Sequence, residues 1–100
     1  MQEKRKHPRK VLDIPVGLAA IPDGERIAAI CHDVSLGGMF LLTDAKLPFG
    51  TLVHVFVSLP RTEGEAALEG TVRWVKNDGL GVQFGLLGAR ETYGLMELLR

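Results

Sequence analysis

The sequence contains a single cysteine, Cys31, among its 100 residues. One thiol cannot form an internal disulfide, and it provides no cysteine pair for a metal site. This scarcity is typical of proteins from a reducing compartment, so we expect a cytoplasmic protein. The sequence also lacks any apolar run near the ~18 residues of a membrane span, and the apolar stretch after its basic start is too short for a signal peptide.

The sequence also lacks the common motifs of catalysis. It contains no HExxH, no GxSxG and no glycine-rich phosphate loop before a helix. Its three histidines, His7, His32 and His54, are not spaced as metal ligands. We therefore expect a protein that is not an enzyme and that needs no metal or cofactor.

Neither sign of charge is in excess overall, because the formal net charge is zero, but the charges are unevenly placed. The stretch EKRKHPRK at residues 3–10 holds five cations and one anion, so residues 1–10 carry +4 and residues 11–100 carry −4. An acidic body argues against a broad nucleic-acid-binding face. A small nucleic-acid-binding barrel that uses only the basic end stays an alternative, and it predicts salt-sensitive binding of oligonucleotides.

Short apolar runs alternate with turns rich in glycine and proline, which predicts an antiparallel sheet closed into a barrel or folded as a sandwich. The stretch NDG at 77–79 is a hairpin signal. Toward the end the period changes, because Tyr93, Met96 and Leu99 recur at helical spacing and predict a helix over 88–100. The expected strands are 12–21, 25–33, 39–43, 51–59, 67–75 and 80–84.

The alternation within these strands predicts which side chains share a face. Val53, Val55 and Val57 should lie together on one face of their strand. Likewise, Val72 and Trp74 should face the core, with Arg73 on the opposite side.

Two short motifs stand out from this background. Arg5 and Arg9 are four residues apart in the basic end, and Asp33-x-Ser35-x-x-Gly38 lies at a turn between strands. The forked guanidinium of arginine can pair with phosphate or with the O6 and N7 edge of guanine. An aspartate can accept hydrogen bonds from the N1–H and N2–H₂ edge of the same base. Each motif alone is weak, because the basic end could be a solvated tail and the aspartate and serine could simply cap the turn.

Taken in this order, with VRWVKNDGLGVQF at 72–84, the two motifs resemble a PilZ domain, and the resemblance covers the chain from about Lys4 to Phe84. It implies an all-β fold, a six-stranded antiparallel β-barrel, that binds the bacterial second messenger cyclic di-GMP. We expect one domain over 1–100, with a flexible basic segment at 1–10 that binds the ligand, the barrel at 11–86 and a C-terminal α-helix at 88–100.

The resemblance also implies residue roles. Arg5 and Arg9 would contact guanine edges and phosphates. Asp33 and Ser35 would contact a guanine and its surroundings, and Gly38 would let the ligand approach the backbone. Lys4, as an extra cation, would favour a stacked pair of ligand molecules. The output would be control of motility, pili or exopolysaccharide through a protein partner, by a monomer or a dimer. The alternative is a nucleotide-independent interaction module that docks on a motility or signalling protein.

Overall fold

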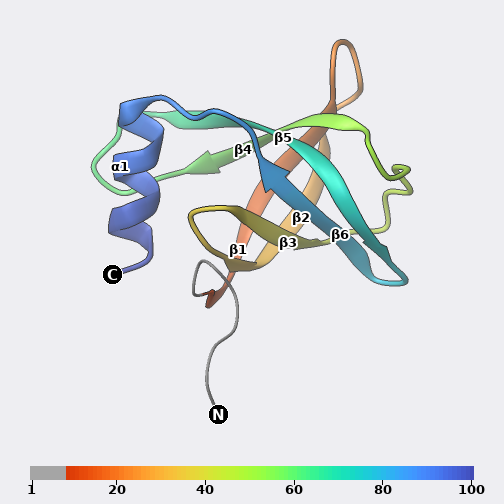
Figure 1. Ribbon diagram of the computed structural model, residues 1–100, viewed down its shortest axis with the longest axis horizontal. Coiled ribbons are helices and arrows are strands. Elements are labelled where there is room, and N and C mark those ends of the chain that lie inside the picture. The colour runs from red at the N-terminus through yellow and green to blue at the C-terminus, as the bar shows by residue number, and fades with distance from the viewer. Residues whose placement is uncertain (1–8) are drawn as a thin grey trace.

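The structure is a computed structural model that describes residues 9–100, and its six strands form a closed barrel in the order β1-β2-β3-β6-β5-β4. All neighbouring strands are antiparallel. Figure 1 shows α1 beside one end of the barrel and the β1–β2 hairpin projecting from the other. The expected six-stranded antiparallel barrel with a C-terminal helix is confirmed. The elements are β1 Lys10–Ala20, β2 Ile27–Val34, β3 Gly38–Leu42, β4 Leu52–Ser58, β5 Glu65–Lys76, β6 Gly79–Phe84 and α1 Ala89–Leu98.

The core fills the inside of the barrel with aliphatic side chains at alternate strand positions. On β4, Val53, Val55 and Val57 are buried while the residues between them are partly exposed. This is the predicted face, and Leu80 and Val82 of β6 are buried in the same phase. Each such side chain contributes about 1.5–3 kcal/mol when fully buried, so the inward faces account for most of the barrel's stability.

Trp74 departs from the predicted alternation. Val72 pairs with Val82, but Trp74 pairs with Gly81, so β5 carries one extra residue at Arg73. This bulge turns both Arg73 and Trp74 outward, and the indole is 51% exposed. The prediction that Trp74 faces the core is therefore wrong, because period-two alternation does not continue through a bulge.

One face of α1 packs on the barrel. Tyr93 and Met96 are about half exposed, whereas Gly94 and Leu95 are buried. A Cβ atom on Gly94 would lie 2.8 Å from Cβ of Leu59, so the missing side chain lets α1 approach the segment after β4. Glycine weakens a helix by about 1 kcal/mol relative to alanine, and this contact offsets that cost. Within residues 9–100, no helix is long and apolar enough to cross a membrane.

Candidate functional site

The turn between β2 and β3 is held by its own serine. The Ser35 backbone N–H donates to the Gly38 carbonyl at 2.8 Å, and the Gly37 N–H donates to Ser35 Oγ at 3.1 Å. The Ser35 side chain is 4% exposed, so its hydroxyl is engaged within the turn. The Phe84 N–H donates to the Gly37 carbonyl at 2.9 Å and ties this turn to β6. The turn-capping interpretation of Ser35 thus describes a contact that is present, and a ligand contact of this side chain stays a prediction.

Gly38 is required where β3 approaches β6. A Cβ atom on Gly38 would lie 2.2 Å from the carbonyl oxygen of Val82, which no side chain can tolerate without a shift of the backbone. In the described part of the chain the glycines with positive φ are Gly50 and Gly64, so Gly38 does not serve a left-handed turn. Packing between strands is therefore sufficient to explain this glycine.

Arg9 and Asp33 form an ion pair across the start of the barrel. Arg9 Nη1 lies 2.5 Å from Asp33 Oδ1, and the two side chains are 23% and 19% exposed. The pairing of β1 with β2 places them there, because Lys10 is opposite Val34. The structure thus joins one member of each sequence motif. Lys4 and Arg5, the other cations of the predicted site, lie outside the described residues.

A cleft of about 330 Å³ opens beside this ion pair. Trp74 covers Gly81, since a Cβ atom at Gly81 would lie 2.4 Å from Cε3 of the indole. Lys76 Nζ lies 5.6 Å from the centre of the Phe40 ring, close enough for a cation–π contact. The cleft therefore combines cations, a carboxylate and two aromatic rings. Its lining residues are Arg9, His32, Asp33, Phe40, Trp74, Lys76 and Gly81.

Strand irregularities produce this collection of side chains. The register of β2 against β3 shifts between Cys31 and Asp33, so His32 and Asp33 are both partly exposed while Cys31 is buried. The bulge at Arg73 likewise exposes Trp74. A third register shift lies in β1, between Val11 and Ile14. Bulges are common beside binding sites because they redirect side chains. Sequence reasoning missed His32, Phe40, Trp74 and Lys76 because it assumed regular strands; the one available signal was Gly81, which leaves space for the indole.

His32 is a titratable residue of the cleft whose surroundings change its pKa. Its Nδ1 lies 2.7 Å from Asp13 Oδ1, and this hydrogen bond raises the pKa of the imidazole above its ordinary value. The charges of Asp13, Asp33 and Asp78 act in the same direction. The carboxylate can only accept, so Nδ1 carries the hydrogen. The raised pKa favours the positively charged imidazolium at the cleft.

Cys31 lies directly behind the cleft and faces the core. Burial raises the pKa of its thiol to about 12, so the group stays protonated at neutral pH. Its Sγ donates a weak hydrogen bond to the Asp33 carbonyl at 3.4 Å.

Among residues 9–100, no cluster of three histidine, cysteine or acidic side chains is arranged to hold a metal ion. The chemistry that the cleft supports is recognition of a planar, anionic ligand.

Comparisons with known proteins identify a family and a fold. The family model for the PilZ domain matches residues 3–98. The PilZ domain of CeSA from a cellulose-synthesizing bacterium has a TM-score of 0.73 at 20% identity, over 91% of this chain and 93% of that one. MotI/DgrA, the inhibitor of motility of Bacillus subtilis, has a TM-score of 0.78 at 18% identity, over 97% of this chain and 50% of its own.

The PilZ domain of YcgR from Escherichia coli, whose structure was determined with c-di-GMP, gives a TM-score of 0.68 at 16% identity. The match covers 96% of this chain and 88% of that one. At these identities the structural likeness establishes the fold. Among curated proteins, no sequence matches this chain.

Proposed function

The chain belongs to the PilZ domain family, and from this premise we propose that it is a receptor for cyclic di-GMP. The observation that carries the proposal is the Arg9–Asp33 pair at the edge of a cleft that also contains Trp74 and Lys76. YcgR, a structural neighbour, was determined with this ligand. The ligand has two phosphates and two guanines, so it needs both cationic and hydrogen-bond-accepting groups.

Each group in the cleft suits one part of that ligand. The Arg9 guanidinium can bind a phosphate or the O6 and N7 edge of guanine in a bidentate manner. The Asp33 carboxylate can accept from N1–H and N2–H₂ of a guanine, and its Oδ2 is not used in the ion pair. The Trp74 indole is half exposed and offers a surface on which a base can stack. Lys76 adds a second positive charge near the phosphates.

The residues of the basic end complete the proposed site. Arg5 precedes Arg9 by four residues and would bind the second guanine edge or phosphate. Lys4 would favour a stacked pair of ligand molecules over a single one. Ser35 acts by holding the turn after Asp33, and Gly38 keeps the backbone of that turn open to the ligand. A charge-assisted hydrogen bond contributes about 1.5–3 kcal/mol, so several of them can offset the cost of ordering a short segment.

Ligand binding would change the surface that a protein partner contacts. Binding neutralises the cations of Arg5, Arg9 and Lys76 and covers the exposed indole, so charge and shape change together. We infer that this cytoplasmic protein, as a monomer or dimer, transmits the change to a component that controls motility, pili or exopolysaccharide. No catalytic step is needed for this role.

One observation favours the alternative, a nucleotide-independent interaction module. Asp33 is already paired with Arg9, and the Ser35 hydroxyl is already used within the turn. Both motif residues therefore have a structural role without a ligand. Under this alternative, the exposed Tyr93 and Met96 of α1 would contact the partner directly.

A calorimetric titration separates the two functions. We expect saturable binding of cyclic di-GMP, with cyclic di-AMP binding at least about 100-fold more weakly because adenine lacks the donor edge that Asp33 reads. GTP keeps that edge but offers only one guanine, so it should also bind more weakly than cyclic di-GMP. Nitrogen-15 amide shifts should centre on residues 32–35, 40 and 74–76. No heat and no amide shifts at saturating cyclic di-GMP would reject the receptor function and leave the interaction module.

A further inference from the structure

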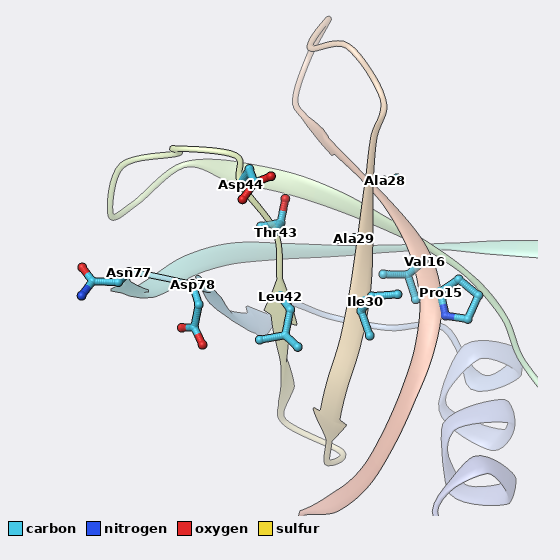
Figure 2. Close-up of a pocket in the computed structure, with 10 residues that line it drawn as sticks. All are labelled: Pro15, Val16, Ala28, Ala29, Ile30, Leu42, Thr43, Asp44, Asn77 and Asp78. Carbon is cyan, nitrogen blue, oxygen red and sulfur yellow. The ribbon is translucent and has the colours of Figure 1, made fainter.

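A second depression lies on the barrel surface, next to the cleft at Arg9. It is an open groove of about 590 Å³, and it shares no lining residue with the cleft at Arg9. Figure 2 shows Pro15, Val16 and Ile30 on the β1–β2 side, with Asp44 and Asp78 across from them. One wall is therefore apolar and the other is polar and acidic.

The groove exists because β2 is longer than its partner β3. The last pair between them is Ile30 with Leu42, whereas β2 continues to Ile27 in its pairing with β1. After Leu42 the chain follows the β5–β6 turn instead, since the Thr43 N–H donates to the Asp78 carbonyl at 3.1 Å. Residues 27–29 of β2 are left, within the described chain, with strand pairing on one side only. The turn between β1 and β2, just before these residues, projects beyond the barrel in Figure 1.

An open strand edge of this kind presents backbone groups in a fixed direction. In an antiparallel ladder, alternate residues direct both N–H and C=O to the same side. Among three consecutive residues, at least one therefore directs both groups away from β1 and into the groove. An extended peptide can pair with such an edge and continue the sheet.

The groove walls indicate the side chains of that peptide. Ile30 is 37% exposed and, with Leu42, offers an apolar contact for side chains on one face of an added strand. Asp44 and Asp78 are exposed at the other wall, and the lining contains no cation. The nearby Lys46 is turned to the carbonyl of Asn77, at 3.3 Å. Residues 11–100 together carry −4, which reinforces the attraction for a cationic segment.

We propose that this groove is a docking site for an extended, basic-and-apolar peptide segment of a partner protein. The segment adds as a strand to the edge of β2 at residues 27–29. Its apolar side chains contact Ile30 and Leu42, and a lysine or arginine near one end pairs with Asp44 and Asp78. The proposal does not depend on nucleotide binding, because the two depressions share no residue.

The test uses a synthetic probe of this chemistry. The probe is a fluorescein-labelled hexapeptide of alternating threonine and valine that ends in two arginines, and its binding is measured by fluorescence anisotropy at physiological salt. We expect saturable binding, with amide shifts confined to residues 27–30, 42–44 and 77–79. A second probe, methylated at alternate backbone nitrogens, should bind at least about tenfold more weakly because it cannot complete the ladder.

Charge reversal supplies the matched pair of variants. The double variant Asp44→Lys with Asp78→Lys should weaken binding of the arginine probe about tenfold, because attraction becomes repulsion. The control, Glu63→Lys with Glu69→Lys, changes the net charge equally at exposed sites outside the groove and should leave affinity within about twofold. All four sites are on the surface, and circular dichroism verifies folding.

Three results would overturn the proposal. Equal affinity for the methylated probe would exclude strand addition. Equal loss of affinity in both charge variants would mean that the net charge of the protein, and not the position of Asp44 and Asp78, determines binding. Self-association that protects the amides of residues 27–30 at assay concentration would mean that a second copy of the chain occupies the groove.

Discussion

The cleft at Arg9 and the groove beside Ile30 adjoin each other on the outside of the barrel, yet they are built in different ways. His32 and Ile30 are two residues apart on β2, and Phe40 and Leu42 are two residues apart on β3. One member of each pair lines the cleft, and the other lines the groove. The cleft is cationic and aromatic, whereas the groove is apolar with an acidic rim.

The difference lies in the regularity of the strands. The cleft depends on bulges in β2 and β5, which turn neighbouring residues such as His32 and Asp33 to the same side. The groove lies beside a regular ladder, where Val16 pairs with Ala29, and arises because β3 ends early. A bulge concentrates side chains, so it suits a small ligand with several polar groups. An unpaired edge offers backbone groups, so it suits a peptide.

Removal of the Arg9 side chain should have the largest effect on the cleft. Arg9→Ala removes the guanidinium proposed to bind the ligand and leaves Asp33 without its ion-pair partner. We expect cyclic di-GMP affinity to fall about 100-fold, which corresponds to one or two charge-assisted bonds. Calorimetry measures the affinity, and the arginine probe of the groove should bind as before.

The matched control is Arg90→Ala, since Arg90 is exposed on α1 and lines neither depression. It should leave both affinities unchanged. If Arg9→Ala binds cyclic di-GMP with native affinity and a native circular dichroism spectrum, Arg9 is a structural residue and the receptor assignment to this cleft is wrong.

Gly38 tests the framework that the two regions share. In Gly38→Ala the new Cβ would meet the Val82 carbonyl at 2.2 Å, so β3 must move away from β6. We expect a loss of about 1–3 kcal/mol in the free energy of unfolding, measured by urea denaturation. Because β3 lines both depressions, binding in each should weaken together.

Gly85→Ala is the control for this change. Its Cβ would lie 3.7 Å from the nearest atom, the Glu69 carbonyl oxygen, so an alanine fits. Similar stability in the Gly38 and Gly85 variants would mean that β3 and β6 can separate without cost. In that case, a ligand contact would be the remaining reason for glycine at position 38.

Trp74 should matter to the ligand more than to the fold. The indole is 51% exposed, so Trp74→Ala should change the melting temperature little while cyclic di-GMP affinity falls about tenfold. Val75→Ala is the control, because that side chain is similarly exposed at 52%. The chain has one tryptophan, so its fluorescence reports this site alone. Native affinity in Trp74→Ala, or fluorescence unaffected by ligand in the wild type, would remove stacking from the proposed mechanism.

The barrel was predictable from sequence because its strands are mostly regular. Alternating valines on β4 mark the inward face, and glycine-containing turns mark the strand ends, so the six strands follow from the pattern and the closed barrel from the family resemblance. The predicted bounds differ from the observed ones by a few residues, since hydrogen bonding rather than apolarity decides where a strand ends.

The site was predictable only in part, because bulges leave no period in the sequence. Arg9 and Asp33 were identified from their motifs, and the structure brings them together. Trp74 was assigned to the core because the pattern of β5 was read without its extra residue at Arg73. The contact face of α1 was not predicted, because Gly94 contributes no apolar side chain to the pattern, yet it lies against Leu59.

The smallest expected effect is a pH dependence at the border of the two regions, where His32 pairs with Asp13. This pairing raises the pKa of His32 in the folded state. Its stabilising contribution is therefore fully present below the unfolded value of about 6.5 and is lost as the pH rises through the folded value. The same proton places a positive charge beside the proposed phosphate site. Cyclic di-GMP should consequently bind somewhat more weakly at pH 8 than at pH 6.

Calorimetry at the two pH values, with His32→Gln and the control His54→Gln, isolates this contribution. His54 packs against Phe56 on β4, with ring centres 5.9 Å apart, and lies outside the cleft. The pH dependence should disappear in His32→Gln and persist in His54→Gln, while the arginine probe of the groove responds to neither substitution. A dependence that survives in His32→Gln would place the titrating group elsewhere and leave the imidazole as a neutral part of the cleft wall.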